Sequence, residues 1–498
     1  MTPPLPIVGI GASAGGVEAL EALFRAMPAD NGMGFVIVTH LPPDRDSLLA
    51  EIIGRASPMP VVNARDGQPV EAQHVYVLPP SATLTIAAGR LRLRHIAAPN
   101  RERSPIDLFF TSLAEDQGER AIGVVLSGGG SDGTLGLKAI KENGGLTVAQ
   151  GTNQTRPRFA DMPASAVAAG FVDLVLPVEE IPDRIIAYVR NWGAFDAERP
   201  EDALTKIHTL LRTQTAHDFS QYKDQTFQRR VQRRMQVVQT TNLEDYISRL
   251  QEDSDEVGAL FRDLLIGVTD FFRDAEAFRA LETSVLPRLF EDRGADDEIR
   301  VWVAGCATGE EAYSIAILLR ERMDSHVGSV GALPRVQIFA TDIDDTAMTV
   351  ARTARYPKTL VNEVSPERLK RFFVEEGATY HVVKDLREMC IFSNHSVIRD
   401  PPFSRLDMIS CRNLLIYLKP ALQGQVFPLF HYALRPGGYL FLGLSENIAR
   451  YTDLFLPLDK TVSSDAAIWS PDHQCHLGRS GGTQGGAGPS GIPAGTRD

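Results

Sequence analysis

Two blocks of the chain alternate short, wholly apolar runs with helix-like segments, and this alternation constrains the fold more than any other feature. The second block runs from Glu298 to about Trp469, and the first holds four such runs: Ile7–Ile10, Phe35–Thr39, Ala121–Ser127 and Leu146–Ala149. Parallel strands buried on both faces read as continuous apolar runs, and they need helical crossovers between them. We therefore predict an α/β chain with two parallel-sheet domains.

The region between these blocks is helical in pattern and shows no convincing strand. A polar, acidic stretch without periodicity precedes it and reads as a linker. In a chain of 498 residues, we expect a first α/β domain over 1–190, a linker over 191–203, an all-α subdomain over 204–280 and a second α/β domain over 281–470. A small antiparallel β insertion is expected at about 356–394. The tail over 471–498 is rich in Gly, Ser and Pro and is expected to be disordered.

The composition excludes several classes of protein. A formal net charge of −12 argues against a general nucleic-acid binder, which needs clustered Lys and Arg. The four cysteines, Cys306, Cys390, Cys411 and Cys475, form no C-x-x-C pair, so we expect neither a disulfide framework nor a metal site. No basic leader and no apolar run of about 20 residues is visible. A soluble, cytoplasmic protein that is not embedded in a membrane is expected.

A serine stands between the first strand and the helix expected after it. Gly11-Ala-Ser-Ala-Gly15 matches G-x-S-x-G, in which small residues allow a sharp turn that exposes the Ser13 hydroxyl. The start of the next helix offers free N–H groups to an oxyanion. Glycine-rich turns also bind dinucleotide phosphates, although the spacing from Gly9 is not G-x-G-x-x-G. The glycines could equally serve only the turn.

A nucleophilic serine needs a base and a carboxylate that orients the base. His40 ends a strand at the same sheet edge as Ser13, whereas His74 and His95 lie in strand-like stretches where a structural role fits better. Asp132 follows a third strand at that edge, where open parallel sheets bind ligands. It could also cap the helix that follows. Ser13, His40 and Asp132 are the candidate triad, in a chain order that differs from that of α/β-hydrolases.

These residues lie in motifs that resemble the catalytic domain of the chemotaxis protein-glutamate methylesterase family (CheB). The motifs are Ile10-Gly-Ala-Ser-Ala-Gly-Gly16, Thr39-His-Leu-Pro-Pro43, Leu126-Ser-Gly-Gly-Gly-Ser-Asp-Gly133, Asp161-Met-Pro-Ala-Ser-Ala166 and Gly170-Phe-Val-Asp173. The resemblance implies Ser13 as nucleophile, His40 as base and Asp132 as orienting group. It also implies a glutamate γ-methyl ester on a chemoreceptor helix as the substrate, with glutamine deamidation by the same route as an extension.

The chain departs from that family beside the triad. The family often has Met at Gly129, Gln at Thr39 and Thr at Ala14, which puts rate and oxyanion geometry in question. Ser13 lies close to the start of the sequence, so the family's phosphorylatable receiver domain is expected to be absent.

A second site follows the first strand of the second block. Glu298–Ala304 leads into Gly305-Cys-Ala-Thr-Gly309, and then Glu310 and Glu311 stand where a dinucleotide would bring its phosphates. Acidic groups there disfavour NAD and suit the cationic S-adenosyl-L-methionine (SAM). The next strand ends at Asp342, an acid placed to hold a ribose hydroxyl, which indicates a nucleoside but not the chemistry.

Several motifs in order over about 204–469 resemble the chemotaxis protein-glutamate O-methyltransferase family (CheR), whose cofactor is SAM. They are Val268-Thr-Asp-Phe-Phe-Arg-Asp274, Ala307-Thr-Gly-Glu-Glu-Ala-Tyr-Ser314, Ala340-Thr-Asp-Ile-Asp344 and Cys411-Arg-Asn-Leu-Leu-Ile-Tyr417, with a class I methyltransferase turn and strand at Leu434–Phe441. The implied catalytic residues are Arg273 and Tyr417. The implied cofactor-binding residues are Thr269, Arg273, Gly305, Glu311, Asp342, Ser396, Val397, Asn413 and Leu414.

Two of these assignments have simpler alternatives. Arg273 could be a surface ion-pair partner, and Tyr417 could belong to the core. The family often has Asn-Leu at Ser396-Val397, a departure that bears on cofactor affinity. Methyl transfer mainly requires the enzyme to position the carboxylate against the methyl group of SAM, because a glutamate carboxylate is already ionised near neutral pH.

Four arginines in an acidic chain mark a candidate substrate-docking helix. They lie largely off the apolar face of Phe227–Val238 and are Arg229, Arg230, Arg233 and Arg234. A solvated surface helix is the commoner reading of such a pattern. We hypothesise that the arginines bind the glutamate-rich cytoplasmic helices of methyl-accepting chemoreceptors.

The main hypothesis is a bifunctional enzyme that installs and removes methyl esters on receptor glutamates. Two opposed activities would waste cofactor, so control by the linker or by a regulatory partner protein is expected. The alternative is a signalling scaffold that binds cofactor or receptor without turnover, supported only by the departures at Gly129 and Ser396.

Overall fold

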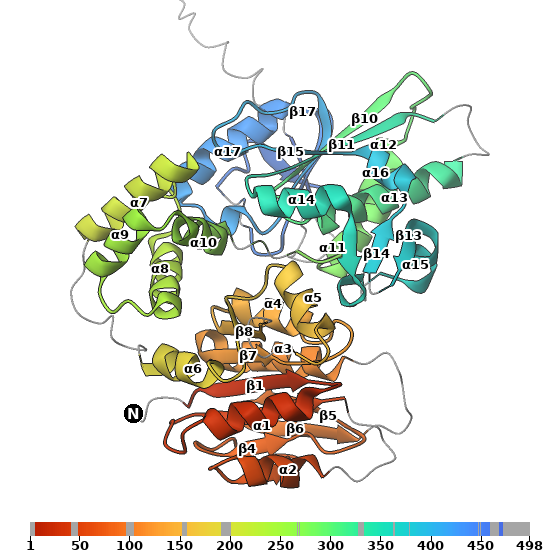
Figure 1. Ribbon diagram of the computed structural model, residues 1–498. Helices are drawn as coiled ribbons and strands as arrows, with labels where there is room; N and C mark the ends of the chain where they lie inside the picture. Colours follow the sequence, from red (N-terminus) through yellow and green to blue (C-terminus); the bar gives the residue numbers. More distant parts are fainter. Residues whose placement is uncertain are drawn as a thin grey trace, which may run out of the picture.

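The structure is a computed structural model of the chain. It describes residues 5–40, 48–95, 104–151, 157–190, 201–265, 267, 269–326, 333–361, 364–377, 379–446, 448, 450–458 and 468–471. The expected linker, apart from its last three residues, and the expected disordered tail, apart from residue 471, lie outside the described residues. The chain forms two α/β halves joined through a group of helices, as Figure 1 shows.

The first half is built on a seven-stranded sheet in the order β3-β4-β2-β1-β7-β8-β9, and all neighbouring strands are parallel. The strands are β1 (Ile7–Ala12), β2 (Gly34–Thr39), β3 (Val61–Asn63), β4 (Val75–Val77), β7 (Ala121–Val125), β8 (Leu146–Gln150) and β9 (Leu174–Leu176). Every residue of β1, β2, β7 and β8 is buried, as the apolar runs predicted.

Helices cover both faces of this sheet, and a hairpin lies beside it. They are α1 (Gly16–Ala26), α2 (Leu49–Ala56), α3 (Pro105–Gln117), α4 (Thr134–Glu142), α5 (Asp161–Ala168) and α6 (Ile181–Arg190), with the turn η1 (Gly118–Arg120) and the hairpin β5 (Ala82–Ala87) and β6 (Arg90–His95). One core joins the sheet to α1, α2 and α6, and another joins it to α3, α4 and α5.

The glycines of β1 serve the packing of α3 on the sheet. A Cβ at Gly11 would lie 2.4 Å from Cγ2 of Ile106, and a Cβ at Gly9 would lie 2.9 Å from the ring of Phe110. Both positions therefore need glycine to let the helix approach. This accounts for Gly9 and Gly11 without a phosphate-binding role.

Next come the helices of the expected all-α subdomain: α7 (Glu201–Thr215), α8 (Asp224–Val238), α9 (Leu243–Glu252) and α10 (Ser254–Leu265). They pack on one face of the second sheet in a core shared with Trp302, Ile409 and Leu440. The boundary expected at residue 280 is wrong. It falls inside an unbroken helical run of α11 (Ala275–Ala280), the π-helical turn η2 (Leu281–Val285) and α12 (Leu286–Leu289), which packs on the other face of that sheet.

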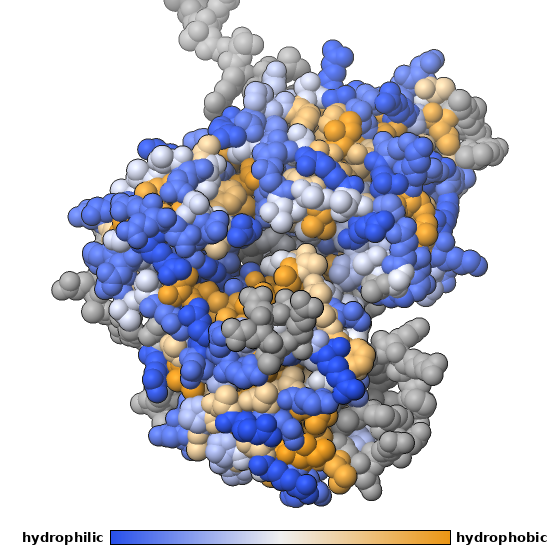
Figure 2. All heavy atoms as spheres, viewed as in Figure 1, coloured by the Kyte–Doolittle hydropathy of each residue, from blue (hydrophilic) through white to orange (hydrophobic). Residues whose placement is uncertain are grey.

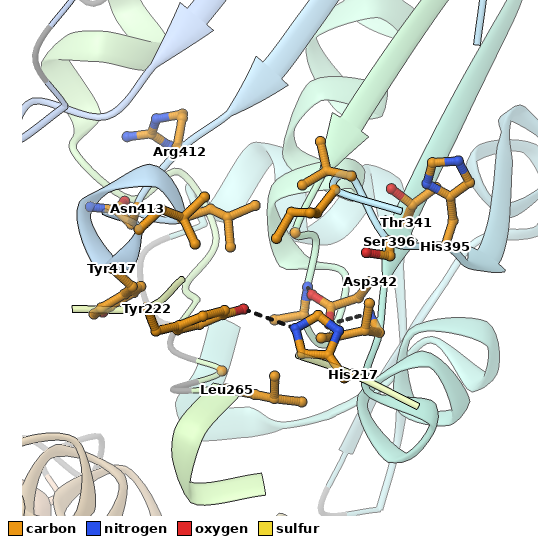
Figure 3. A pocket seen from close by; sticks show the side chains of 18 residues that line it. His217, Tyr222, Leu265, Thr341, Asp342, His395, Ser396, Arg412, Asn413 and Tyr417 are labelled. Atoms are coloured by element: carbon orange, nitrogen blue, oxygen red, sulfur yellow. Dashed lines mark hydrogen bonds between the residues drawn. The ribbon is translucent and has the colours of Figure 1, made fainter. Parts of the chain in front are cut away.

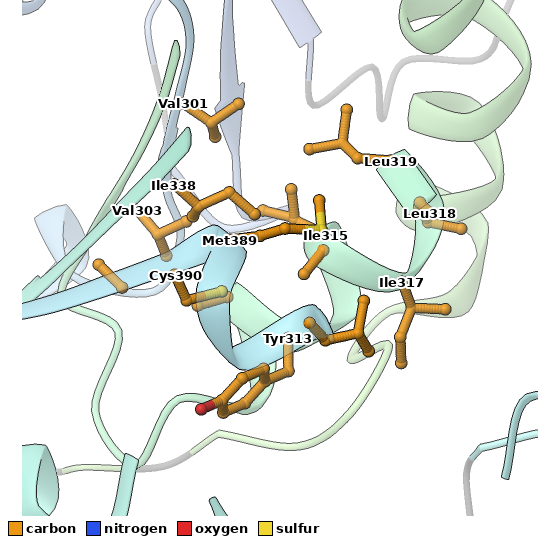
Figure 4. Close-up of a cluster of buried hydrophobic side chains, with 14 of the residues drawn as sticks. Val301, Val303, Tyr313, Ile315, Ile317, Leu318, Leu319, Ile338, Met389 and Cys390 are labelled. Atoms are coloured by element: carbon orange, nitrogen blue, oxygen red, sulfur yellow. The ribbon is translucent and has the colours of Figure 1, made fainter. Parts of the chain in front are cut away.

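The second sheet has the order β15-β11-β10-β16-β17-β19-β18, parallel through its first five strands and antiparallel in the last three. Its strands are β10 (Glu298–Ala304), β11 (Arg335–Asp342), β15 (Cys390–Asn394), β16 (Leu406–Cys411), β17 (Leu434–Leu442), β18 (Phe455–Pro457) and β19 (Ile468–Pro471). The helices around it are α13 (Glu310–His326), α14 (Asp345–Thr353), α16 (Lys384–Met389) and α17 (Pro420–Ala433), with the turn η4 (Leu415–Tyr417). Figure 4 shows Val301, Ile338 and Ile315 in the core between this sheet and α13.

The expected antiparallel insertion is present but shorter than predicted. Its sheet has the order β12-β14-β13, formed by β12 (Arg355–Pro357), β13 (Phe373–Glu376) and β14 (Thr379–Val382), with η3 (Lys358–Val361) and α15 (Pro366–Phe372) alongside. β15, which the prediction included, pairs in parallel with β11 and so belongs to the main sheet.

The two halves pack directly on each other. Val237 of α8 belongs to the core of the first half, and Leu135 of α4 packs against the core of the second. Hydrophobic side chains gather at this junction on the face that Figure 2 shows. Among the described helices, none combines the length and apolar character needed to cross a membrane.

Candidate active sites

The candidate triad of the first half is assembled as a chain of hydrogen bonds. The Ser13 Oγ lies 3.1 Å from Nδ1 of His40, and Nε2 of His40 lies 2.7 Å from Oδ2 of Asp132. These three side chains follow β1, β2 and β7, which are neighbours in the sheet. The parallel register brings the carboxyl ends of these strands to one edge, so the predicted constellation forms.

The hydrogen bonds define which histidine nitrogen works as the base. Nε2–H donates to the Asp132 carboxylate, which leaves Nδ1 unprotonated and able to accept the Ser13 proton. This ring orientation is the reverse of the arrangement usual in serine proteases, where Nε2 is the base. The geometric requirement is the same, namely a base oriented by a carboxylate and within reach of the hydroxyl.

The carboxyl group of Asp132 accepts hydrogen bonds from three backbone N–H groups. Its Oδ1 accepts from the N–H groups of Asp107 and Gly133, both at 2.9 Å, and its Oδ2 accepts from the N–H of Ile106 at 3.1 Å. Ile106 and Asp107 lie in the first turn of α3, where N–H groups lack intrahelical partners. Asp132 therefore has the cap-like role that the sequence suggested, but at α3 and not at the helix that follows it.

Asp107 lies behind the triad, and its surroundings shift its pKa. Burial, and then repulsion by the Asp132 charge, raise the pKa of Asp107 well above its usual value. Its Oδ1 accepts a hydrogen bond from the N–H of Gly136. The raised pKa favours the neutral form of Asp107 beside the Asp132 carboxyl group.

The position of Gly129 shows what the departure from the methylesterase pattern does. Among the described residues, no atom lies within 4 Å of where its Cβ would stand, whereas a Cβ at neighbouring Gly128 would lie 2.1 Å from Sδ of Met162. The hydrogen bonds of the triad form with glycine at this position.

The candidate cofactor pocket of the second half lies at the carboxyl ends of β10, β11 and β16. Of the nine predicted cofactor residues, six line it: Gly305, Asp342, Ser396, Val397, Asn413 and Leu414. Tyr417, predicted as catalytic, lines it too. Figure 3 shows these side chains arranged around a common cavity, with Asp342 on one side and Asn413 and Tyr417 on the other.

The backbone of this pocket is strained in a way typical of ligand sites. Asn413 and Ala307 line it with positive φ angles of 57° and 45°. Outside the pocket lining, Phe272 and Asp274 of the loop before α11 also have positive φ angles, of 54° and 60°. Left-handed conformations cost energy for residues other than glycine, and they cluster where a site must be shaped. At Gly305, φ is 74°, and a Cβ would lie 3.1 Å from Leu414.

Asp342 has the environment that a nucleoside site requires. Its Oδ2 accepts from the N–H of Ala307 at 2.9 Å, and its Oδ1 accepts from those of Ile343 and Asp344 at 2.7 and 3.0 Å. Burial raises the pKa of Asp342, and these three hydrogen bonds oppose the rise. The carboxylate is fixed in orientation, and its remaining lone pairs can accept from hydroxyl groups of a ligand.

Three predicted cofactor residues do not line the pocket. Thr269 directs its carbonyl to Lys138 of the first half, and the carbonyl of Arg273 accepts from Arg412. Glu311 accepts from the Ser410 hydroxyl at 2.6 Å and lies 3.6 Å from Arg412. Direct contact of these side chains with the cofactor stays a prediction.

Sequence reasoning missed several residues that shape the pocket. His217 and Tyr222, from the segment between α7 and α8, line it and hydrogen bond to each other at 3.4 Å (Figure 3). Burial lowers the pKa of His217 to about 4, so it is neutral near pH 7. No motif marks these residues, because the helical region reaches the pocket only through tertiary packing.

Arg412 also lines the pocket and was not predicted, although it stands inside a quoted motif. Its fully buried guanidinium donates to the carbonyl of Arg273 at 2.8 Å and to Asp274 at 2.7 Å, and it lies over the rings of Phe278 and Phe441. It thereby ties the loop that carries Arg273 to the end of β16. We infer a positioning role for it.

The predicted docking helix is corrected by the structure. Arg233 and Arg234 of α8 are buried, and Arg230 is half-buried. Arg233 forms ion pairs with Asp173 and Asp263, and Arg234 pairs with Glu256. Arg233 and Arg234 therefore cannot form an exposed surface for a receptor helix, and only Arg229 stays exposed, 3.6 Å from Glu119.

Comparisons with known proteins agree with this division of the chain. Residues 8–185 match the family model of the CheB methylesterase, residues 202–265 that of the all-alpha domain of the CheR methyltransferase, and residues 267–463 that of the SAM binding domain of the CheR methyltransferase. The cofactor pocket draws on both CheR regions, and SAM is the cofactor of the matched domain.

Three relatives illustrate the match. A 104.1 kDa protein from the hypE 3′ region of Rhodobacter capsulatus is 36% identical over 84% of this chain, and the chain spans 46% of its length. A chemotaxis protein methyltransferase of Listeria monocytogenes is 32% identical over 47% of this chain and 86% of its own length. A protein-glutamate methylesterase/protein-glutamine glutaminase of Moorella thermoacetica is 35% identical over 38% of this chain and 46% of its own length. The chain thus belongs to the CheR methyltransferase family and carries a CheB methylesterase domain ahead of its CheR region.

Proposed function

We propose that the chain methylates glutamate side chains of a chemoreceptor with SAM and hydrolyses the same γ-methyl esters at its own serine site. The Ser13–His40–Asp132 hydrogen-bond chain, in the same polypeptide as a nucleoside-type pocket, is the observation that carries the proposal. The unpaired, buried thiols of Cys306, Cys390 and Cys411 support a reducing, cytoplasmic setting, where receptor helices would be reached.

The esterase reaction follows from the geometry of the triad. The Ser13 Oγ attacks the ester carbonyl and passes its proton to Nδ1 of His40, which then protonates the departing methanol. Water repeats the cycle and releases the glutamate carboxylate from the serine. Asp132 stabilises the imidazolium formed in both steps, and the first turn of α1 is the candidate donor of hydrogen bonds to the oxyanion.

In the second site, the residues bind and orient the reactants. Asp342 would accept hydrogen bonds from ribose, and Gly305 lets the cofactor approach the backbone. When bound, SAM supplies an electrophilic methyl group on a sulfonium. Tyr417 borders the pocket, and the loop carrying Arg273 is tied to β16 by Arg412, so these residues would align the acceptor carboxylate and exclude water.

The proposal is tested with methyl-labelled SAM and receptor-bearing membranes. Wild type should place label on the receptor and release labelled methanol. Ser13→Ala should keep incorporation and lower methanol release by roughly 10³-fold or more, whereas Asp342→Ala should lose incorporation. Ser131→Ala, on the loop beside Asp132, is the matched control and should behave as wild type. No incorporation and no Ser13-dependent methanol would favour a scaffold without turnover, and control by a regulatory partner would then lose its purpose.

A further inference from the structure

A second cleft lies where the two halves meet, and it shares one wall with the cofactor pocket. It has a volume of about 340 Å³ and is lined by Glu119, Glu142, Asn143 and Gly144 of the first half and by residues of α8 from the second. Tyr417 lines both this cleft and the cofactor pocket. Tyr417 therefore separates the methyltransferase site from a cleft that the methylesterase domain also lines. In Figure 1, α4 lies at the edge of the first half that faces the second.

The backbone around Glu142 is clamped to the methyltransferase half. Arg230 of α8 donates to the carbonyls of Lys141 and Glu142 at 3.4 and 3.2 Å, and Arg233 donates to the carbonyl of Gly145 at 3.0 Å. One turn earlier, Nζ of Lys138 donates to the carbonyl of Thr269 at 2.6 Å and to Asp270 at 2.7 Å. These contacts fix the C-terminus of α4 against the loop that carries Arg273.

The Glu142 carboxyl group is treated differently from its backbone. Its Oε1 is buried and has no hydrogen-bond partner among the described residues, and Nζ of Lys138 lies 4.0 Å from it, although the side chain as a whole is 25% exposed. Lys138 is already engaged by Asp270. Structural carboxylates in such places are normally paired. A fixed backbone that carries a carboxyl group with one unpartnered oxygen is suited to presenting that group to a reactant.

We propose that Glu142 is a methyl acceptor for the chain's own methyltransferase site. The proposal rests on the methyltransferase activity proposed above. A carboxylate oxygen of Glu142 would attack the sulfonium methyl of SAM. A C–O bond forms, the C–S bond breaks, and the anion and the cation become a neutral ester and a neutral thioether without any proton transfer.

Burial favours this reaction. Desolvation, opposed by Lys138 and also by Arg273 and Arg230, raises the pKa of Glu142 to about 7, and the nearby Asp270 adds to the rise. Burial raises the pKa of the Tyr417 phenol, and the Glu142 charge adds to the rise. Tyr417 and Glu142 line the same cleft. Methylation removes a charge that the site solvates poorly, so the ester is the better-accommodated form.

The α4 helix also separates this acceptor from the serine site of the same molecule. The helix begins two residues after Asp132 and ends at Glu142, and its nine residues span about 13 Å. The Ser13 site of the same molecule therefore cannot reach the ester while the halves are packed together. Its removal would need a second molecule or separation of the halves.

The test is methyl transfer to the purified full chain in the Ser13→Ala background, with peptide mass spectrometry and a receptor-derived peptide as external acceptor in the same tube. One methyl group should appear on Glu142 at a rate independent of protein concentration and rising through about pH 7. Glu142→Gln should abolish it. Glu119→Gln is the matched control in the same cleft and should leave it unchanged.

A second measurement avoids the cofactor. The pKa of Glu142 is higher in the folded state than in the unfolded state, so ionisation of Glu142 lowers the free energy of unfolding as pH rises above the unfolded pKa. This loss is complete above about pH 7. Glu142→Gln should therefore raise the melting temperature at about pH 8 and leave it unchanged at about pH 4. A lower melting temperature of Glu142→Gln at about pH 8 would show that the charged Glu142 is a structural ion-pair partner, and it would overturn the proposal. Methylation of the external peptide without label on Glu142 would overturn it as well. If neither the external peptide nor Glu142 is labelled, this proposal and the proposed methyltransferase function are both overturned.

Discussion

At the scale of single residues, the two sites depend on carboxyl groups whose ionisation is set by their surroundings. Asp132 accepts hydrogen bonds from backbone N–H groups and lies against Nε2 of His40. Burial, and then the nearby Asp132 carboxyl group, raise the pKa of Asp107 beside it. The sequence predicted Asp132 from its place at a strand end. It could not predict Asp107, because no motif records which helix will pack against the triad.

The protonation of Asp107 gives a prediction with a defined sign. The pKa of Asp107 is higher in the folded state than in the unfolded state. Its contribution to the free energy of unfolding is therefore fully present below the unfolded pKa, and it is lost as pH rises toward the folded pKa. Asp107→Asn keeps an acceptor for the N–H of Gly136 and cannot ionise. We expect it to raise the melting temperature at about pH 8 and to leave it unchanged at about pH 3. A lower melting temperature at pH 8 would mean that the charged form of Asp107 is needed.

At the scale of elements, α8 shows how an interface can be hidden in a charge pattern. Its arginines were predicted to bind an external acidic helix, and one of them instead binds acidic and carbonyl groups of the methylesterase domain. Arg233 lies between Asp173 of the first half and Asp263 of α10, and both carboxylates are buried. Burial opposes the charge of Arg233, but the pull of these carboxylates raises its pKa.

Removing Arg233 should therefore be costly. Arg233→Met would leave two buried carboxylates without their shared cation, and we expect a loss of about 3–5 kcal/mol in the free energy of unfolding. Arg229→Ala removes an exposed arginine from the same helix and should change stability by less than about 0.5 kcal/mol. Denaturant titration of both variants measures the difference. Equal effects would contradict the buried bridge.

At the scale of the whole molecule, the two opposed domains form one packed body across a junction that combines apolar and charged contacts. Val237 of α8 enters the methylesterase core, and Lys138 of α4 contacts the methyltransferase loop at Thr269. Such contacts predict that the halves unfold together, since local opening would expose buried charge as well as apolar surface.

Binding of S-adenosylhomocysteine, the product of the cofactor, tests whether the two halves unfold together. S-adenosylhomocysteine at 100 times its dissociation constant should stabilise the folded state by about 2.7 kcal/mol. Calorimetry should show a single transition that moves upward, and Asp342→Ala should remove the shift. A second transition whose temperature does not change with the ligand would show that the methylesterase domain unfolds on its own.

The local order of the sequence determined much of this protein. Buried strands appear as apolar runs, a serine between small residues marks a strand-to-helix turn, and acids at strand ends mark a ligand edge, because each feature depends on neighbours in the chain. Ser13, His40 and Asp132 could be found together, and Asp342 at the end of its own strand, since parallel strands bring their carboxyl ends to one edge. Asn413 followed from the resemblance to the methyltransferase family.

Only the tertiary structure decided what lies across the domain junction. Arg233 and Arg234 carry the same charge in sequence as exposed Arg229, yet packing buries them, and this reverses the meaning of the pattern. His217 and Tyr222 reach the cofactor pocket from a helical region that no motif connects to it. Glu142 is an ordinary helix residue until the second domain removes its water. Contacts between distant segments depend on shape and desolvation, and neither is written in local sequence.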